Sequence, residues 1–103
     1  MTSCWFHPEA LAEADEAAAF YREQQAGLEV RFVEALDDAI SRIRRNPAMY
    51  RCIEGTIRKC RVMRFPYGVI YRIGGERIEI IAIMHLRRQP GYWRSRTYHA
   101  GGG

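Results

Sequence analysis

The sequence has 103 residues, of which 48% are hydrophobic and 27% charged, and it carries a formal net charge of +4. This length fits a single domain, and the hydrophobic fraction excludes an intrinsically disordered chain. The apolar run at 80–84 is far shorter than the roughly 20 residues that a membrane-spanning helix needs, and no signal peptide is visible, so we predict a cytoplasmic protein with no membrane partner.

The first half of the chain is predicted to form a strand and two helices. Residues 3–7 are a short apolar-rich run that indicates an opening strand, and Pro8 suits the first turn of the helix that follows. Apolar residues recur at helical spacing up to Gly27, and again up to Asn46, where Pro47 ends the second helix. The two helices are expected to form an αα-hairpin.

The second half changes to the pattern of β-strands. Three segments are rich in β-branched and aromatic residues: 56–65, 69–73 and 77–85. Tight turns separate them, so neighbouring strands are antiparallel and form a three-stranded meander. We predict a single α+β domain over residues 1–100, with the helices packed on one sheet face, and a flexible glycine tail at 101–103.

The last predicted strand is apolar on both faces. By strict alternation its side chains form two sets: Ile78, Ile80, Ala82 and Met84 on one face, and Glu79, Ile81, Ile83 and His85 on the other. Such a strand is usually covered twice, but the helical hairpin can cover only one face of the sheet. Either the C-terminal tail folds over the other face, or that face is a groove around Ile81 and Ile83 that receives a partner peptide.

The charges divide sharply between the two halves of the chain. Residues 1–55 contain six Arg and ten Asp or Glu, whereas residues 56–103 contain nine Arg, one Lys and two Glu. The field of the second half attracts phosphates or acidic chains. Fifteen of the sixteen cations are Arg, whose planar fork binds carboxylates and phosphates. We therefore predict an acidic or nucleic-acid-bearing partner for the meander.

The three cysteines, Cys4, Cys52 and Cys60, lack the spacing of a metal site or of a disulfide framework. Free cysteine behaves as a small hydrophobic residue. We therefore predict reduced, mostly buried thiols, no metal and no cofactor.

Two stretches of the second half carry a family resemblance. Residues 64–73 read Arg-Phe-Pro-Tyr-Gly-Val-Ile-Tyr-Arg-Ile, and residues 84–90 read Met-His-Leu-Arg-Arg-Gln-Pro. With these stretches, and over residues 5–88, the chain resembles the RelE/ParE toxins of bacterial type II toxin–antitoxin modules, which include plasmid stabilisation proteins. The resemblance implies a RelE/ParE-like fold and a growth-inhibiting toxin. It also implies a cognate antitoxin as partner, in a toxin–antitoxin hetero-oligomer.

The resemblance implies one of two mechanisms. RelE-like members resemble ribosome-dependent mRNA endoribonucleases that need no metal, because a side-chain base and acid move protons while cations stabilise the phosphate. The catalytic candidates for that mechanism are His85, Arg61 and Arg64, with Glu54 as a further base. ParE-like members resemble inhibitors of DNA gyrase that act by binding it.

The sequence departs from the nuclease members at two places. Lys59 is the only lysine, so the lysine pairs of some relatives are missing, and Tyr67-Gly68 stands where nuclease members carry a catalytic Arg. We therefore predict a ParE-like toxin that binds DNA gyrase. The alternatives are an endoribonuclease that acts on mRNA at the ribosome and a small nucleic-acid-binding regulator.

The residues predicted to contact the target or the antitoxin are Arg61, Arg64, Ile81, Ile83, His85, Arg87, Arg88, Tyr92 and Trp93. In neutralisation, an amphipathic antitoxin segment is expected to lie across Ile81 and Ile83 while its acidic side chains meet the arginines. Structural roles are the alternative for three of these residues. His85 is then a strand-end residue, and Tyr92 and Trp93 cap the sheet.

Overall fold

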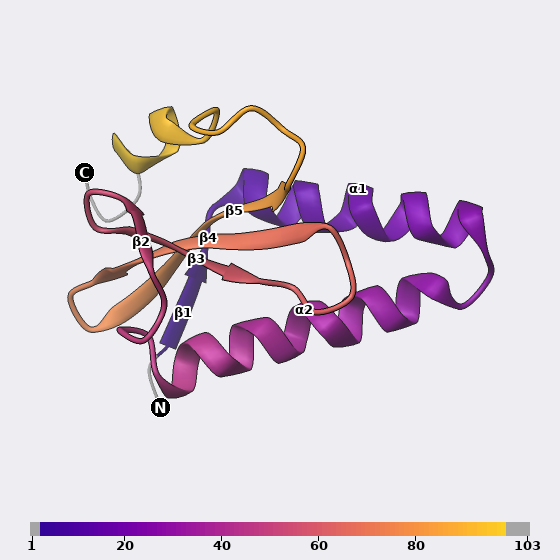
Figure 1. The fold of residues 1–103 in the computed structure, drawn as a ribbon, viewed down its shortest axis with the longest axis horizontal. Helices are drawn as coiled ribbons and strands as arrows, with labels where there is room; N and C mark the ends of the chain where they lie inside the picture. The colour runs from indigo at the N-terminus through magenta and orange to yellow at the C-terminus, as the bar shows by residue number, and fades with distance from the viewer. Residues whose placement is uncertain (1–2, 99–103) are drawn as a thin grey trace.

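The fold is a five-stranded sheet with a helical hairpin on one face, as the computed structural model shows for residues 3–98 (Figure 1). The elements are β1 (Ser3–Phe6), α1 (Pro8–Gln24), α2 (Leu28–Arg45), β2 (Cys52–Glu54), β3 (Ile57–Arg61), β4 (Tyr67–Gly74), β5 (Arg77–His85) and a 3-10 helix, η1 (Arg94–Tyr98). The strand order is β1-β5-β4-β3-β2, with β1 parallel to β5 and the other neighbours antiparallel. The predicted α+β class, opening strand, αα-hairpin and meander are confirmed.

Some predicted boundaries change in the structure. The predicted strand 56–65 is the shorter β3, whereas the strand predicted at 69–73 is longer and includes Tyr67 and Gly74. The sequence does not predict β2, because a strand of three residues is too short to show an alternating pattern. All three residues are exposed in the structure. The predicted glycine tail lies outside the described residues. Within residues 3–98, no helix is long and apolar enough to cross a membrane.

The ends of the two helices follow from local chemistry. His7 lies in an extended conformation before α1, and its Nδ1 accepts a hydrogen bond from the Glu9 N–H at 3.1 Å. Pro8 loses no hydrogen bond at the first helical position. Gly27 has a φ of 92°, a left-handed conformation that favours glycine, and it makes the turn from α1 into α2.

The main core lies between the helical hairpin and the sheet. Its fully buried residues are Ala10, Phe32, Ala39, Ile43, Cys60, Val62, Val69, Tyr71, Ile78 and Ile80. Tyr71 keeps its polar group satisfied, because its hydroxyl donates to the Pro47 carbonyl at 2.6 Å. The prediction of mostly buried thiols holds for Cys60 only, since Cys4 is half-buried and Cys52 is exposed on β2.

A β-bulge in β5 reverses the alternation that the sequence predicts. Tyr71 pairs with Ile80 and Ile70 pairs with Ala82, so Ile81 is an extra residue without a partner on β4. Because side chains alternate along a strand, one extra residue moves every later side chain to the opposite face. Ala82 therefore lies away from the helices and Ile83 lies toward them, which is the reverse of the predicted assignment.

The C-terminal tail covers the sheet face that lies opposite the helices. After β5 the chain turns back toward β2, from orange to yellow in Figure 1. Trp93 packs there against a second core of Ile57, Ile70, Ile81, Ala82 and Met84. Ile81 is 0% exposed and Ile83 2% exposed, so the predicted groove around them is wrong. The structure shows the other alternative, in which the tail folds over this face.

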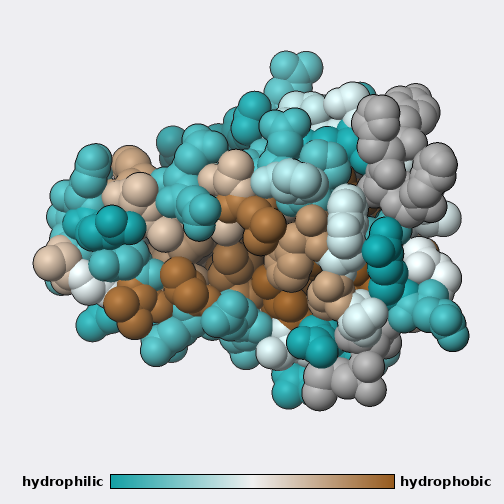
Figure 2. All heavy atoms as spheres, turned by 180° about the vertical axis from the view of Figure 1, so that it is seen from behind, coloured by the Kyte–Doolittle hydropathy of each residue, from teal (hydrophilic) through white to brown (hydrophobic). Residues whose placement is uncertain are grey.

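An apolar surface remains on the outer side of the helical hairpin. Leu11 of α1 is 50% exposed, and Val30 and Val33 of α2 are 54% and 43% exposed. Figure 2 shows hydrophobic residues gathered along this side of the molecule, which faces away from the sheet. We call this surface the outer face of the hairpin. Exposed apolar patches mark interaction surfaces more often than isolated hydrophobic side chains do.

Candidate binding surface

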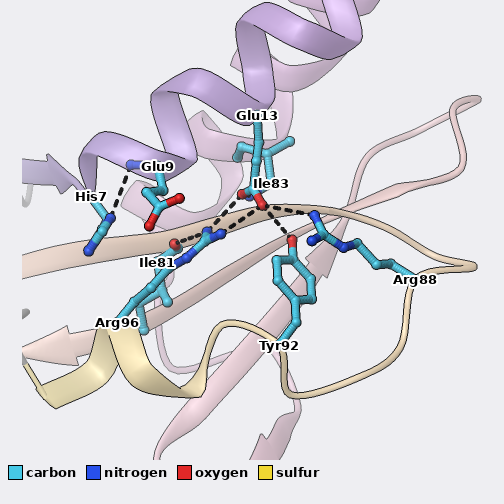
Figure 3. Close-up of polar contacts among 8 residues, drawn as sticks. All are labelled: His7, Glu9, Glu13, Ile81, Ile83, Arg88, Tyr92 and Arg96. Atoms are coloured by element: carbon cyan, nitrogen blue, oxygen red, sulfur yellow. Dashed lines mark hydrogen bonds and ion pairs between the residues drawn. The ribbon is translucent and has the colours of Figure 1, made fainter.

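Glu13 of α1 organises the polar contacts that hold the tail to the sheet (Figure 3). Arg96 binds it through both ends of its guanidinium, with Nη1 2.9 Å from Oε1 and Nη2 3.0 Å from Oε2. The Tyr92 hydroxyl donates to Oε2 at 2.7 Å, and the Ile83 N–H donates to Oε1 at 3.0 Å. A single carboxylate therefore joins α1, β5 and the tail.

These contacts also satisfy the backbone of β5 beside its bulge. β1 ends at Phe6, opposite Ile80, so the following residues of β5 have no neighbouring strand on that side. Arg96 Nη1 donates to the carbonyl of Ile81 at 3.1 Å, while Glu13 accepts from the N–H of Ile83. Buried backbone groups without partners are costly, so the two charged side chains take the place of a strand.

The Glu13–Arg96 ion pair lies in a nearly buried position, with side chains 12% and 9% exposed. Burial disfavours the charge of Arg96, but the hydrogen bonds and the charge of Glu13 outweigh it and raise the pKa of Arg96. Nothing in the sequence indicates this pair. Glu13 is one of several acids early in α1, and Arg96 is one of many arginines in the basic half.

The buried Tyr71 and the half-buried Tyr92 lead to a prediction about alkaline pH. Burial raises the pKa of Tyr71, and burial together with the hydrogen bond to Glu13 raises the pKa of Tyr92 above the usual value near 10. A group whose pKa is raised in the folded state stabilises the fold below its unfolded pKa and loses that contribution as pH rises. We expect urea-unfolding stability to fall above about pH 10, and to fall less steeply in Tyr92→Phe. A slope unchanged by this substitution would contradict the prediction.

Five of the ten cations of the basic half form ion pairs within residues 3–98. Arg72 and Arg77 bind Glu79, and Arg94 binds Glu54. Arg88 lies 3.6 Å from Glu13, with its guanidinium 3.8 Å from the centre of the Tyr92 ring. Within residues 3–98, no hydrogen bond or ion pair joins the side chains of Lys59, Arg61, Arg64 and Arg87 to another group. We call these four the unpaired cations.

Three of the predicted arginines lie at one end of the sheet. Arg61 ends β3, and Arg64 lies in the turn from β3 to β4. The segment after β5, which carries Arg87, joins this turn through a hydrogen bond from the Leu86 N–H to the Pro66 carbonyl at 2.9 Å. Arg64 has a φ of 71°, which is uncommon for a residue with a side chain and marks strain that is often kept at functional sites.

The predicted acid–base residues are not brought together. His85 ends β5, half-buried beside the ring of Tyr67, and its Nδ1 accepts from the Arg87 N–H at 3.1 Å. Glu54 lies on β2, with β3 and β4 between it and β5. Hydrogen bonds from Arg94 lower the pKa of Glu54, which makes it a weaker base. Glu54 therefore does not share a site with His85.

Three other predicted contact residues are buried. Ile81, Ile83 and Trp93 are covered by the fold itself, so none of them is available to a partner in this conformation. Trp93 and the half-buried Tyr92 instead cap the sheet, as their structural alternative predicts. The outer face of the hairpin is the apolar surface that sequence reasoning missed. Exposed apolar positions in a helix add to the same periodic pattern as core positions, so only burial separates them.

Comparisons with known proteins agree with this fold. Residues 5–90 match the family model of the ParE toxin of the type II toxin–antitoxin system, parDE. A solved structure described as the chromosomal ParDE TA system from P. aeruginosa has a TM-score of 0.75 and 16% sequence identity, and the match covers 84% of this chain and 98% of that chain. No curated protein matches the sequence. Because the family model covers most of the chain, the protein belongs to the ParE toxin family of type II toxin–antitoxin systems.

Proposed function

We propose that this ParE-family toxin stops growth by binding DNA gyrase, and that a cognate antitoxin neutralises it. The observation that supports a binding toxin most directly is the set of unpaired cations at one end of the sheet. Arg61, Arg64 and Arg87 are available to an acidic or phosphate-bearing target, whereas His85 and Glu54 form no acid–base pair. Charge that is free in the monomer serves association, because it steers the encounter with a target of opposite sign.

We place the antitoxin on the outer face of the hairpin. The antitoxin segment expected across Ile81 and Ile83 would have to displace the tail to reach Ile81, and it would meet Ile83 buried on the helix side of the sheet. Leu11, Val30 and Val33 are already exposed and need no such rearrangement. An amphipathic helix could lay its apolar side along this face, as helices do in hydrophobic grooves.

The proposed target is tested by inducing the toxin with and without the protein encoded by the adjacent reading frame. A gyrase inhibitor is expected to cause filamentation and a DNA-damage response, and the purified toxin should block supercoiling by gyrase. His85→Ala is expected to leave most of this activity, because a binding inhibitor needs no proton transfer at that imidazole.

Primer extension on cellular transcripts provides the opposing measurement. Cuts in ribosome-bound mRNA, abolished by His85→Ala, would overturn the gyrase proposal in favour of a RelE-like nuclease. Arg94→Gln serves as the matched control, because Arg94 is exposed but paired with Glu54. It should leave both growth inhibition and supercoiling inhibition unchanged.

A further inference from the structure

The sheet face opposite the helices has two parts. The tail covers the part around Ile57, Ile70 and Ile81. β3 continues beyond this cover, and its alternation places Lys59 and Arg61 on the same face as Ile57, because Cys60 belongs to the core on the helix side. The uncovered part of this face is therefore basic.

Gly68 has no side chain to project from this basic part of the sheet. It pairs with Arg61 across the strands, and a Cβ added at Gly68 would lie 3.1 Å from both Cγ and Cδ of Lys59 and 3.6 Å from Leu86 Cδ2. Such a contact is tight, so the missing side chain lets the alkyl part of Lys59 lie across β4 toward Leu86. Lysine side chains often pack their stems in this way while the ammonium group stays in water.

Three unpaired cations lie on this part of the sheet or in the segment that follows β5. Lys59 and Arg61 come from β3, and Arg87 follows Leu86 directly. Within residues 3–98, the side chains of these three residues make no ion pair, whereas Arg72, Arg77, Arg88, Arg94 and Arg96 all do. We call Lys59, Arg61 and Arg87 the basic platform.

We propose that the basic platform binds the phosphodiester backbone of a nucleic acid. Peptide partners depend on a few apolar anchors that fill pockets. The hollow beside His85 and the groove beside Phe65 include neither Lys59 nor Arg61, so neither of these two hollows gives a peptide an anchor point on the platform. A phosphate backbone needs only cations that can approach it closely, and it is bound without regard to sequence.

The proposal goes beyond the toxin's protein target, because it assigns a nucleic-acid ligand to a surface whose Arg61 and Arg87 also support the gyrase proposal. It can also fail independently. A toxin that inhibits gyrase with no affinity for nucleic acid would leave the proposed function intact and overturn the platform. Nucleic-acid binding without gyrase inhibition would support the platform and overturn the proposed function.

The test measures binding of the whole chain to a labelled short DNA duplex and to an RNA strand of the same sequence, by fluorescence anisotropy at several KCl concentrations. For the duplex, three phosphate contacts predict a slope of about −3 for log K against log salt, since each contact contributes about −0.9. Lys59→Met, Arg61→Gln and Arg87→Gln should each reduce the slope by about one unit. Preference for either probe identifies the nucleic acid, and both outcomes support the platform.

Arg94→Gln is the matched control, because it removes an exposed but paired arginine and should leave the slope unchanged. Lys59→Met keeps the alkyl stem over Gly68, and circular dichroism checks that each variant is folded. The proposal is overturned if neither probe binds at low salt, or if the three variants and the control show the same slope. It is also overturned if poly-glutamate binds the platform more tightly than either nucleic acid, because the surface would then suit an acidic protein.

Discussion

Replacing Glu13 with alanine is expected to lower the free energy of unfolding by about 3–5 kcal/mol, the usual cost of removing one partner from a buried ion pair. The substitution leaves the guanidinium of Arg96 charged and nearly buried without its carboxylate. It also leaves the Tyr92 hydroxyl and the Ile83 N–H without their acceptor. The measurement is urea unfolding at neutral pH, followed by circular dichroism and by tryptophan fluorescence.

Asp15→Ala is the matched control for this prediction. Asp15 is an exposed acid on the same helix, and its replacement should change stability by no more than about 0.5 kcal/mol. A double-mutant cycle with Arg96→Met then isolates the pair, because the double variant should lose less than the sum of the two single variants. Additive effects, or a loss under about 1 kcal/mol for Glu13→Ala, would show that the pair does not hold the tail.

The sequence predicts most of the fold because periodicity and turn chemistry are local signals. The strand at Arg77–His85 is predicted at its observed bounds, α2 ends directly before Asn46, and Gly27 separates the two helices. The bulge at Ile81 escapes prediction, since an apolar residue on either side of it fits both face assignments. Its position depends instead on Glu13 and Arg96, which lie far away in sequence and satisfy the backbone around it.

The candidate surface is less predictable than the fold, because charge in a sequence does not reveal which charges are already paired. Arg88 and Arg87 are adjacent and look equivalent, yet Arg88 lies against Glu13 and Tyr92 while Arg87 has no partner within residues 3–98. Lys59 gave no signal beyond its being the only lysine. Its importance depends on Gly68, whose lack of a side chain matters only once the two strands are paired.

The second large effect concerns the antitoxin. Val33→Asp is expected to weaken the complex with the protein of the adjacent reading frame by about 100-fold, or roughly 2.8 kcal/mol. A carboxylate at the centre of an apolar interface loses its water without gaining a partner. The fold should be nearly unaffected, since Val33 is 43% exposed and lies outside the core. Isothermal titration calorimetry of the purified pair measures the affinity, and thermal unfolding of the toxin alone checks the stability.

Met49→Asp is the control that shows whether a carboxylate weakens antitoxin binding only on the outer face of the hairpin or at any exposed apolar position. Met49 is also an exposed apolar residue, at 60%, but it lies in the segment between α2 and β2 and not on the outer face of the hairpin. The same chemical change there should leave the affinity within about twofold. Equal weakening by both variants would indicate an antitoxin that wraps beyond the hairpin. Normal affinity in Val33→Asp would place the antitoxin elsewhere, and its segment would then have to displace the tail to reach Ile81.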